Sequence, residues 1–204
     1  MRKAEPRKNA KQDRAKVTVD SIVEATSLLL SELGLKKITT NKIVKKAGVS
    51  IGSLYQYFPG KEAIFAIVFE KQLRSDLEKF RVKIDSLSPK THTLKEAIDE
   101  LVFFFMQDFY SQSKIYQELL YSVLTIKSLR FTLEHDQLVE KYIGDFVKRY
   151  KEDVRDDFDL PLFTFIIQYT VKGLKFGIAF NEKSDYLDDI ASHLSVVIHQ
   201  HLKS

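Results

Sequence analysis

The chain has 204 residues, 44% of them hydrophobic, which is enough to bury one sizeable core or two small ones. It has no cysteine, so disulfides and thiolate metal sites are excluded, and a reducing cytoplasm suits it. The longest wholly apolar run, Leu101–Met106, is far shorter than the ~20 residues of a membrane span, and the formal net charge is +4. With a charged N-terminus and no apolar stretch behind it, we expect a soluble, cytoplasmic protein with no membrane partner.

The basic residues are concentrated in the N-terminal part of the chain. Residues 1–61 hold thirteen Lys or Arg and five Asp or Glu, a net charge of +8, whereas residues 62–204 carry −4. This favours a polyanion such as nucleic acid as the partner of residues 1–61, because Lys and Arg near phosphates release counterions. The alternative is that the basic residues only keep the protein soluble.

The first two segments differ in composition. Residues 1–16 contain seven Lys or Arg, two acidic residues and almost no large apolar side chain, which predicts a basic flexible arm. Such an arm could follow the DNA backbone or reach a minor groove, or it could only be solvated. From Val17 to Leu33 the apolar residues recur at helical spacing, which predicts a first helix that ends at Gly34.

Residues 39–62, TTNKIVKKAGVSIGSLYQYFPGKE, have the pattern of two short helices joined by a tight turn. Two threonines can cap the first helix, Gly48 suits the left-handed backbone that ends it, and Ser50 can cap the second. Leu54 and Phe58 lie one turn apart and would anchor the second helix in a core. On spacing alone, this pair is either a DNA-binding helix-turn-helix or a plain αα-hairpin.

A family resemblance distinguishes these two readings. The residues that carry it are Ile22-Val-Glu-Ala25, Gly34, Thr39-Thr40, Ile43-Val44, Ala47-Gly48-Val49-Ser50, Gly52-Ser53-Leu54-Tyr55-Gln56-Tyr57-Phe58 and Lys61-Glu62. Over roughly residues 17–66 the chain resembles the N-terminal domain of TetR-family transcriptional regulators. The resemblance implies a three-helix DNA-binding domain in which a first helix braces the helix-turn-helix.

The rest of the chain is predicted to be helical too. Apolar residues at helical spacing and capping residues indicate helices over residues 61–80, 93–110, 113–124, 129–150, 160–180 and 186–202. Thr93 and Glu96 have the spacing of a capping box at the start of the second of these helices. We therefore expect an all-α fold of about nine helices. Its parts would be a flexible arm (residues 1–16), a helix-turn-helix DNA-binding domain (17–61) and a larger ligand-binding and dimerisation domain (62–204).

The resemblance implies which residues contact DNA. Base-edge or groove contacts are expected from Asn41, Ser50, Ile51, Gly52 and Gln56. Phosphate contacts are expected from Thr40, Ser53, Tyr55, Tyr57 and Lys61. The chemistry fits several of these, since Asn and Gln can pair with adenine and a lysine supplies a point charge to a phosphate. Gln56 departs from the aromatic residue that some family members carry at this place.

Family members usually enclose a small-molecule pocket in the second domain. The candidates to line it here are Phe65, Phe69, Phe103, Phe104, Met106, Phe109, Tyr110, Tyr116, Tyr121, Phe163, Gln168, Tyr169 and Lys172. Their aromatic and Met side chains suit a flat or fatty ligand, although aromatic stripes are more often ordinary core. Gln168 and Lys172 share a helix face and could orient an acidic ligand, or Lys172 could instead extend to solvent.

A recognition helix reads only a few base pairs, so a homodimer on a palindromic operator is expected. Its interface is expected on the last two helices, at Gly173, Gly177, Ile190, Leu194, Val197 and Ile198, where two glycines four residues apart leave a shallow groove. The alternative is that both helices belong to the core of a monomer.

The function implied by the resemblance is that of a ligand-responsive repressor, released from a double-stranded DNA operator by a small apolar, aromatic or fatty effector. An enzyme is not expected, because the five histidines do not form HExxH and GxSxG, P-loop and GxGxxG motifs are absent. No cofactor or metal is expected. The alternatives are a structural or nucleoid-organising DNA-binding protein without an inducer, and a small-molecule binder with a vestigial DNA-binding domain.

Overall fold

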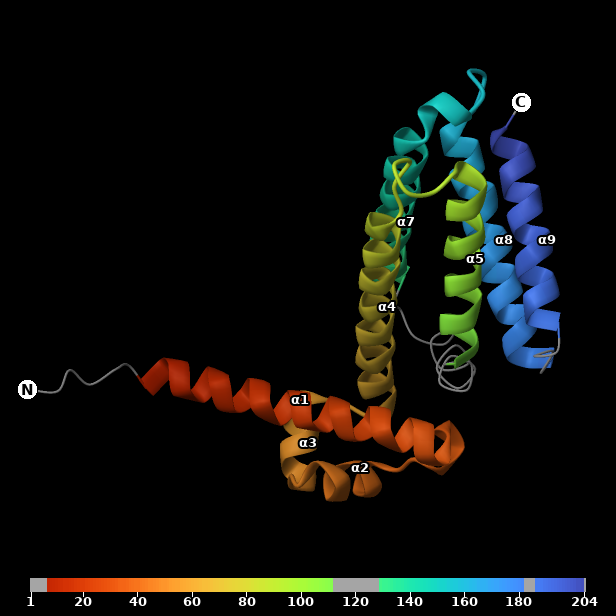
Figure 1. Cartoon of the computed structure of the whole chain (residues 1–204). Coiled ribbons are helices and arrows are strands. Elements are labelled where there is room, and N and C mark those ends of the chain that lie inside the picture. The colour runs from red at the N-terminus through yellow and green to blue at the C-terminus, as the bar shows by residue number, and fades with distance from the viewer. Residues whose placement is uncertain (1–6, 112–128, 182–185, 204) are drawn as a thin grey trace, which may run out of the picture. The chain divides into compact units, whose positions relative to one another are not determined.

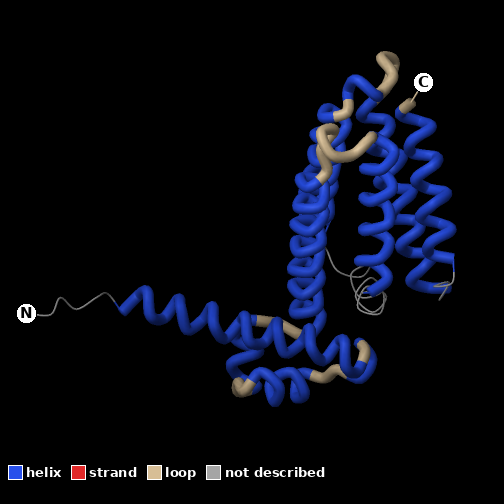
Figure 2. Tube along the Cα trace, viewed as in Figure 1, coloured by secondary structure: helices blue, strands red, loops and turns tan. Residues whose placement is uncertain are grey.

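The computed structural model describes residues 7–111, 129–181 and 186–203 of the chain. All regular structure in these ranges is helical (Figure 2). The α-helices are α1 (Arg7–Leu33), α2 (Thr40–Ala47), α3 (Ile51–Tyr57), α4 (Lys61–Ser86), α5 (Leu94–Ser111), α7 (Leu129–Arg149), α8 (Leu160–Asn181) and α9 (Leu187–Leu202), with single 3-10 turns at Leu35–Lys37 and Lys151–Asp153. The predicted all-α fold is confirmed. The helix predicted over residues 113–124 lies outside the described ranges.

The N-terminal helices form a small domain in which α1 packs against both α2 and α3 (Figure 1). Its core consists of fully buried aliphatic side chains, among them Ile22 and Leu30 on α1, Ile43 on α2 and Leu54 on α3. α1 ends at Leu33 because Gly34 takes a positive φ of 74°, as the sequence predicts.

The start of α1 differs from our expectation for residues 1–16. The helix begins at Arg7, so Arg7–Lys16 continue it instead of forming a separate arm. The segment is rich in Lys, Arg, Gln and Ala, which have high intrinsic helix propensity, and α1 extends through it from its packed part. Residues 1–6 are not described.

Contacts divide the chain within α4: the first unit runs to Lys71, and the second unit begins at Gln72. This division falls later in α4 than the boundary after Lys61 that the sequence suggests. α4 therefore begins in the first unit and contributes its second half to the other.

The second unit is a helical bundle in which α5 packs against α9 and α8, and α7 packs against α8 (Figure 1). α5 begins with the predicted capping box: the Thr93 backbone N–H donates to Glu96 Oε2 at 2.8 Å, and the Glu96 N–H donates to Thr93 Oγ1 at 3.3 Å. Arg149 of α7 caps the C-terminal end of α4. It donates to the carbonyl of Ile84 at 2.8 Å and pairs with Asp85 at 2.8 Å, which joins α4 to α7.

Candidate DNA-binding surface and ligand cavity

The helix-turn-helix is defined by its caps. Thr39 Oγ1 accepts from the N–H of Lys42 at 3.3 Å at the start of α2, and Gly48 ends that helix in the left-handed conformation at φ 68°. Ser50 Oγ accepts from the N–H of Ser53 at 3.0 Å, which starts α3. These are the caps that the sequence predicts, and they fix the short turn between α2 and α3.

One side of α3 is buried and another is open to solvent. Leu54 and Phe58 are buried, as predicted, and hold α3 against the domain core. Residues 51, 52, 55 and 56 lie one and four positions apart, so they share a side of the helix, and all four are exposed. Two of them are large: Ile51 is 41% exposed and Tyr55 is 54% exposed. This exposed side can reach the base edges of a major groove.

The ten residues predicted to contact DNA all lie in the first unit. Six are exposed, namely Asn41, Ser50, Ile51, Gly52, Tyr55 and Gln56. Four are half-buried, namely Thr40, Ser53, Tyr57 and Lys61. Lys61 Nζ donates to the carbonyl of Ile38 at 3.2 Å and lies 6.0 Å from the centre of the Phe65 ring. Its ammonium group is thus held against the domain, and its phosphate contact stays a prediction.

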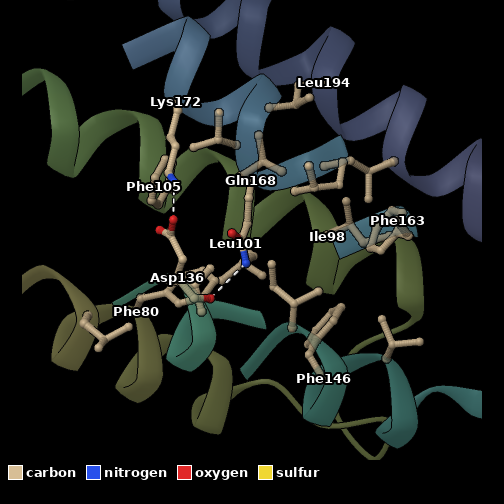
Figure 3. A pocket seen from close by; sticks show the side chains of 18 of the residues that line it. Phe80, Ile98, Leu101, Phe105, Asp136, Phe146, Phe163, Gln168, Lys172 and Leu194 are labelled. Atoms are coloured by element: carbon tan, nitrogen blue, oxygen red, sulfur yellow. Dashed lines mark hydrogen bonds and ion pairs between the residues drawn. The ribbon is translucent and has the colours of Figure 1, made fainter. Parts of the chain in front are cut away.

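The second unit contains a cavity of about 150 Å³ between α4, α5, α7, α8 and α9 (Figure 3). Most of its wall is apolar. The lining residues are Leu73, Asp76, Leu77, Phe80, Ile98, Leu101, Val102, Phe105, His135, Asp136, Val139, Ile143, Phe146, Val147, Phe163, Ile167, Gln168, Val171, Lys172, Leu194, Ile198 and Leu202. Such a cavity, with a few convergent polar groups, is the usual form of a small-molecule site.

The polar groups of the wall include a connected set between α7 and α8 (Figure 3). Lys172 Nζ donates to Asp136 Oδ2 at 2.5 Å, and Gln168 Nε2 donates to the backbone carbonyl of Asp136 at 3.0 Å. His135 Nδ1 lies 3.4 Å from Asp136 Oδ1. Asp136 is therefore the centre of the set, with Gln168 and Lys172 one turn apart on α8.

The residues predicted to line a pocket lie in several places. Phe163, Gln168 and Lys172 line the cavity. Met106 is buried but is not among its lining residues, and Phe103 and Phe104 are half-buried elsewhere on α5. Phe65 and Phe69 are buried in the first unit, and Tyr169 is 55% exposed. Tyr116 and Tyr121 lie outside the described residues, as do the side chains of Phe109 and Tyr110.

Sequence analysis did not find the contribution of α7 to the cavity. Asp136 and His135 were not candidates, because Lys172, the partner of Asp136, is 36 residues away and no local pattern marks the pairing. The signal available was two adjacent titratable residues, His135 and Asp136, within an otherwise amphipathic helix.

The residues predicted for a dimer interface divide into two groups. Leu194 and Ile198 are buried and line the cavity, so they are covered within a single chain. Val197 is 58% exposed, and a Cβ at Gly173 or Gly177 would meet no atom within 4 Å. Ile190 is half-buried.

Further apolar side chains are exposed on the same helices. Leu162, Phe165, Ile166 and Tyr169 recur on one side of α8, with exposures between 44% and 59%, and Val196 lies beside Val197 on α9. We call these six residues, four on α8 and two on α9, the α8–α9 apolar surface. Exposed apolar side chains that gather on one side of a helix can mark an interaction site.

Metal sites and membrane-spanning helices have no candidates within the described ranges. No group of three His, Cys, Asp or Glu residues there could hold a metal ion. No helix in those ranges has the length and hydropathy to cross a membrane.

Comparison with known proteins agrees with the geometry of the first unit. Residues 22–68 match the family model described as bacterial regulatory proteins, tetR family. The chain is 38% identical over 66 residues to the nucleoid occlusion factor SlmA of Haemophilus ducreyi, a match that covers 32% of this chain. It covers only 31% of that relative, so the likeness to these curated proteins spans about a third of their length.

Solved structures match over most of the chain. SmeT, the repressor of a multidrug efflux pump of Stenotrophomonas maltophilia, superposes with a TM-score of 0.63 at 14% identity, covering 91% of this chain and 90% of SmeT. FadR of Bacillus subtilis, solved with stearoyl-CoA, gives 0.60 at 18% identity, covering 89% and 98%. At such identities the likeness shows a shared fold. The family match over residues 22–68 agrees with the sequence resemblance.

Proposed function

We propose that the chain, whose residues 22–68 match the tetR family of bacterial regulatory proteins, is a ligand-responsive repressor. In this proposal a homodimer binds a palindromic operator and leaves it when a small apolar molecule enters the cavity. The observation that carries the proposal is the capped helix-turn-helix, whose second helix has one side buried and one side exposed.

Recognition would use the exposed side of α3. Gln56 can pair with adenine through its side-chain amide, whose oxygen accepts and whose nitrogen donates, and Ile51 can contact a thymine methyl group. The exposed polar residues Asn41 and Ser50, at the start of α2 and before α3, would flank these contacts. Phosphate contacts from the basic first unit would add an affinity that is independent of sequence and decreases with salt.

Dimerisation would use the α8–α9 apolar surface. Its six side chains are between 43% and 59% exposed in the single chain, and burying them against a second copy would gain hydrophobic free energy. The open space beside Gly173 would let the partner's helix approach closely. This surface replaces Leu194 and Ile198 of the sequence-based interface, because both are already buried.

Release would be transmitted by α4. This helix begins at Lys61 in the first unit, and its residues Leu73, Leu77 and Phe80 line the cavity. A ligand that binds better to one position of α4 favours that position. To release DNA, that position of α4 must move the recognition helices of the dimer away from their spacing of about one DNA turn, ~34 Å. A cytoplasmic location fits such a DNA-binding role.

A second function is favoured by one observation. The relatives matched at 38% identity are named nucleoid occlusion factors, and the match with one of them spans 66 residues of this chain. A DNA-binding nucleoid-organising protein without an inducer therefore stays the alternative. Release of the protein from DNA by an effector would favour the repressor over the nucleoid-organising protein.

The test is selection of bound sites from random double-stranded DNA at ~150 mM salt, where sequence-independent attraction is weak. We expect an enriched palindrome with half-sites about one helical turn apart. Selection with Gln56→Ala should lose preference at one or two positions of each half-site, while the same change at the exposed Gln107 of α5 should leave the palindrome intact. Absence of any enriched sequence would refute the proposal.

A further inference from the structure

The size of the cavity limits its ligand. Its volume is about 150 Å³. A cavity of about 150 Å³ lined by Leu, Ile and Phe is known to bind benzene, whereas drug-sized ligands occupy about 300–1,000 Å³. The part of a ligand that the cavity encloses without rearrangement of the helices is therefore about the size of one ring with small substituents.

The shape of the wall favours a ring. Phe80 of α4 and Phe105 of α5 meet edge to face, with their ring centres 6.1 Å apart. Phe146 and Phe163 approach from α7 and α8 (Figure 3). Aromatic groups prefer edge-to-face and offset contacts, so these rings offer an aromatic guest favourable partners in addition to area burial.

The polar residues of the wall disfavour both anionic and cationic ligands. Both carboxylate oxygens of Asp136 already have partners, one in Lys172 and the other in His135. The Asp136 side chain is only 20% exposed, and that of Lys172 is 39% exposed. An anionic ligand would have to take Lys172 from Asp136. A cationic ligand would have to take Asp136 from Lys172, or take the second carboxylate of the wall, Asp76, from the Gln72 side chain that donates to it at 2.9 Å. Separating Lys172 from Asp136 leaves one partly buried charge without its counterion, which is costly.

An uncharged ligand avoids that cost. A hydroxyl or amide group can bond to the Gln168 side-chain carbonyl, or donate to the pair, without separating Lys172 from Asp136. We propose that this site, if it is the effector site of the proposed function, takes a compact, uncharged ring compound with a single hydrogen-bonding group, and that the Lys172–Asp136 pair selects against charged analogues.

The first test compares three probes of nearly equal size: benzyl alcohol, benzoate and benzylammonium. Each is titrated into the full-length chain at pH 7 and followed by calorimetry. We expect benzyl alcohol to bind at least about tenfold more tightly than either ion, because only the ions must break the pair. Equal or tighter binding of an ion, or no binding of any probe at millimolar concentration, would overturn the proposal.

Two variants test the role of the pair. Asp136→Asn leaves Lys172 without its counterion, so the affinity for benzoate should rise about tenfold relative to that for benzyl alcohol. Lys172→Met leaves Asp136 without its counterion, so the affinity for benzylammonium should rise instead. Asp157→Asn and Lys148→Met change exposed side chains outside the cavity and should keep the wild-type order. If both cavity variants fold, as shown by cooperative melting, and keep that order, the pair is not the selector. If one does not fold, the wild-type order still decides the charge selectivity.

A last comparison tests size and separates this inference from the proposed function. 1-Decanol is uncharged but much longer than benzyl alcohol, so we expect it to bind no more tightly, and a gain of tenfold or more would contradict a compact ligand. Operator binding is measured on the same samples. Probe binding in the expected order without loss of operator affinity would refute the effector role and leave the selectivity of the cavity standing. Release of operator by benzoate or 1-decanol alone would support the repressor and overturn the compact, uncharged ligand.

Discussion

Tyr150, directly after α7, has the largest side chain among the fully buried residues that the structure describes. Its ring packs beside Phe146, with ring centres 5.1 Å apart, but its hydroxyl has no hydrogen-bond partner within the described ranges. Burial raises the pKa of this hydroxyl above its usual value, although the nearby Arg149 opposes that shift. The hydroxyl therefore reduces stability, while the ring increases it.

We expect Tyr150→Phe to raise the free energy of unfolding by about 1 kcal/mol, because it removes a buried polar group and keeps the ring. Urea unfolding measures this. The same change at Tyr55, which is 54% exposed, serves as the control and should have almost no effect. A loss of stability in Tyr150→Phe would mean that the hydroxyl has a partner.

Gly48 shows how one residue fixes the turn between α2 and α3. It has φ 68°, yet a Cβ there would meet no atom within 4 Å. We expect Gly48→Ala to lower the free energy of unfolding by about 1 kcal/mol through backbone strain alone. Gly52 lies inside α3 at ordinary helical angles, and its nearest contact would be Ser50 Oγ at 3.8 Å. Gly52→Ala should therefore raise stability, and equal effects of the two changes would contradict this account.

At the scale of elements, three carboxylates of α5 have pKa values below their usual range. The backbone N–H and hydroxyl of Thr93 lower the pKa of Glu96, and a hydrogen bond from Lys83 lowers that of Glu100. For Asp99, burial is the largest single influence and raises the pKa, but hydrogen bonds from Lys95 and Ser195 outweigh it. Ser195 is on α9, so Asp99 joins α5 to α9.

These shifts predict a loss of stability in acid. The unfolded chain binds protons with the ordinary pKa values of about 4.5 for Glu and 3.8 for Asp, and the folded chain only at lower pH. Their stabilisation is therefore present at neutral pH and is lost as the pH falls below about 4. Between pH 6 and pH 3, the free energy of unfolding measured in urea should fall less for Asp99→Asn than for the wild type. The same change at the exposed Asp188 is the control. If the free energy of unfolding falls equally with pH in Asp99→Asn and the wild type, the role of Asp99 is contradicted.

At the scale of the whole molecule, the α8–α9 apolar surface predicts the oligomeric state. Phe165→Asp places a charge on that surface and should reduce the mass in light scattering from about twice 23.7 kDa to 23.7 kDa at micromolar concentration. Val82→Asp changes a side chain of α4 that is equally open, at 55% exposed, and should leave the dimer intact. A wild-type mass near that of one chain would contradict the dimer.

The helix-turn-helix could be predicted from sequence almost residue by residue, because its determinants are local. Thr39, Gly48 and Ser50 act within one turn of themselves, and Leu54 and Phe58 mark the buried side of a short helix. The same local signals predicted the Thr93 and Glu96 capping box of α5.

The second unit was less predictable, because its site depends on which helices become neighbours. α9 carries apolar residues on two sides, and sequence alone does not show that Leu194 and Ile198 face the cavity while Val197 faces solvent. The Asp136–Lys172 pair joins residues on two helices, and no spacing rule within one helix reveals it. Side chains such as Phe65 and Tyr169 are aromatic, as pocket-lining residues often are, but they do not line the cavity.

The proposed function requires that the exposed side of α3 reads a DNA sequence. The most direct measurement is the ratio of dissociation constants for the selected palindrome and for a scrambled duplex of equal length and composition at ~150 mM salt. We predict that the palindrome binds at least about a thousandfold more tightly, as sequence-specific regulators do. A ratio near one, with both affinities decreasing equally as salt rises, would show that the first unit only attracts phosphates and would contradict the account.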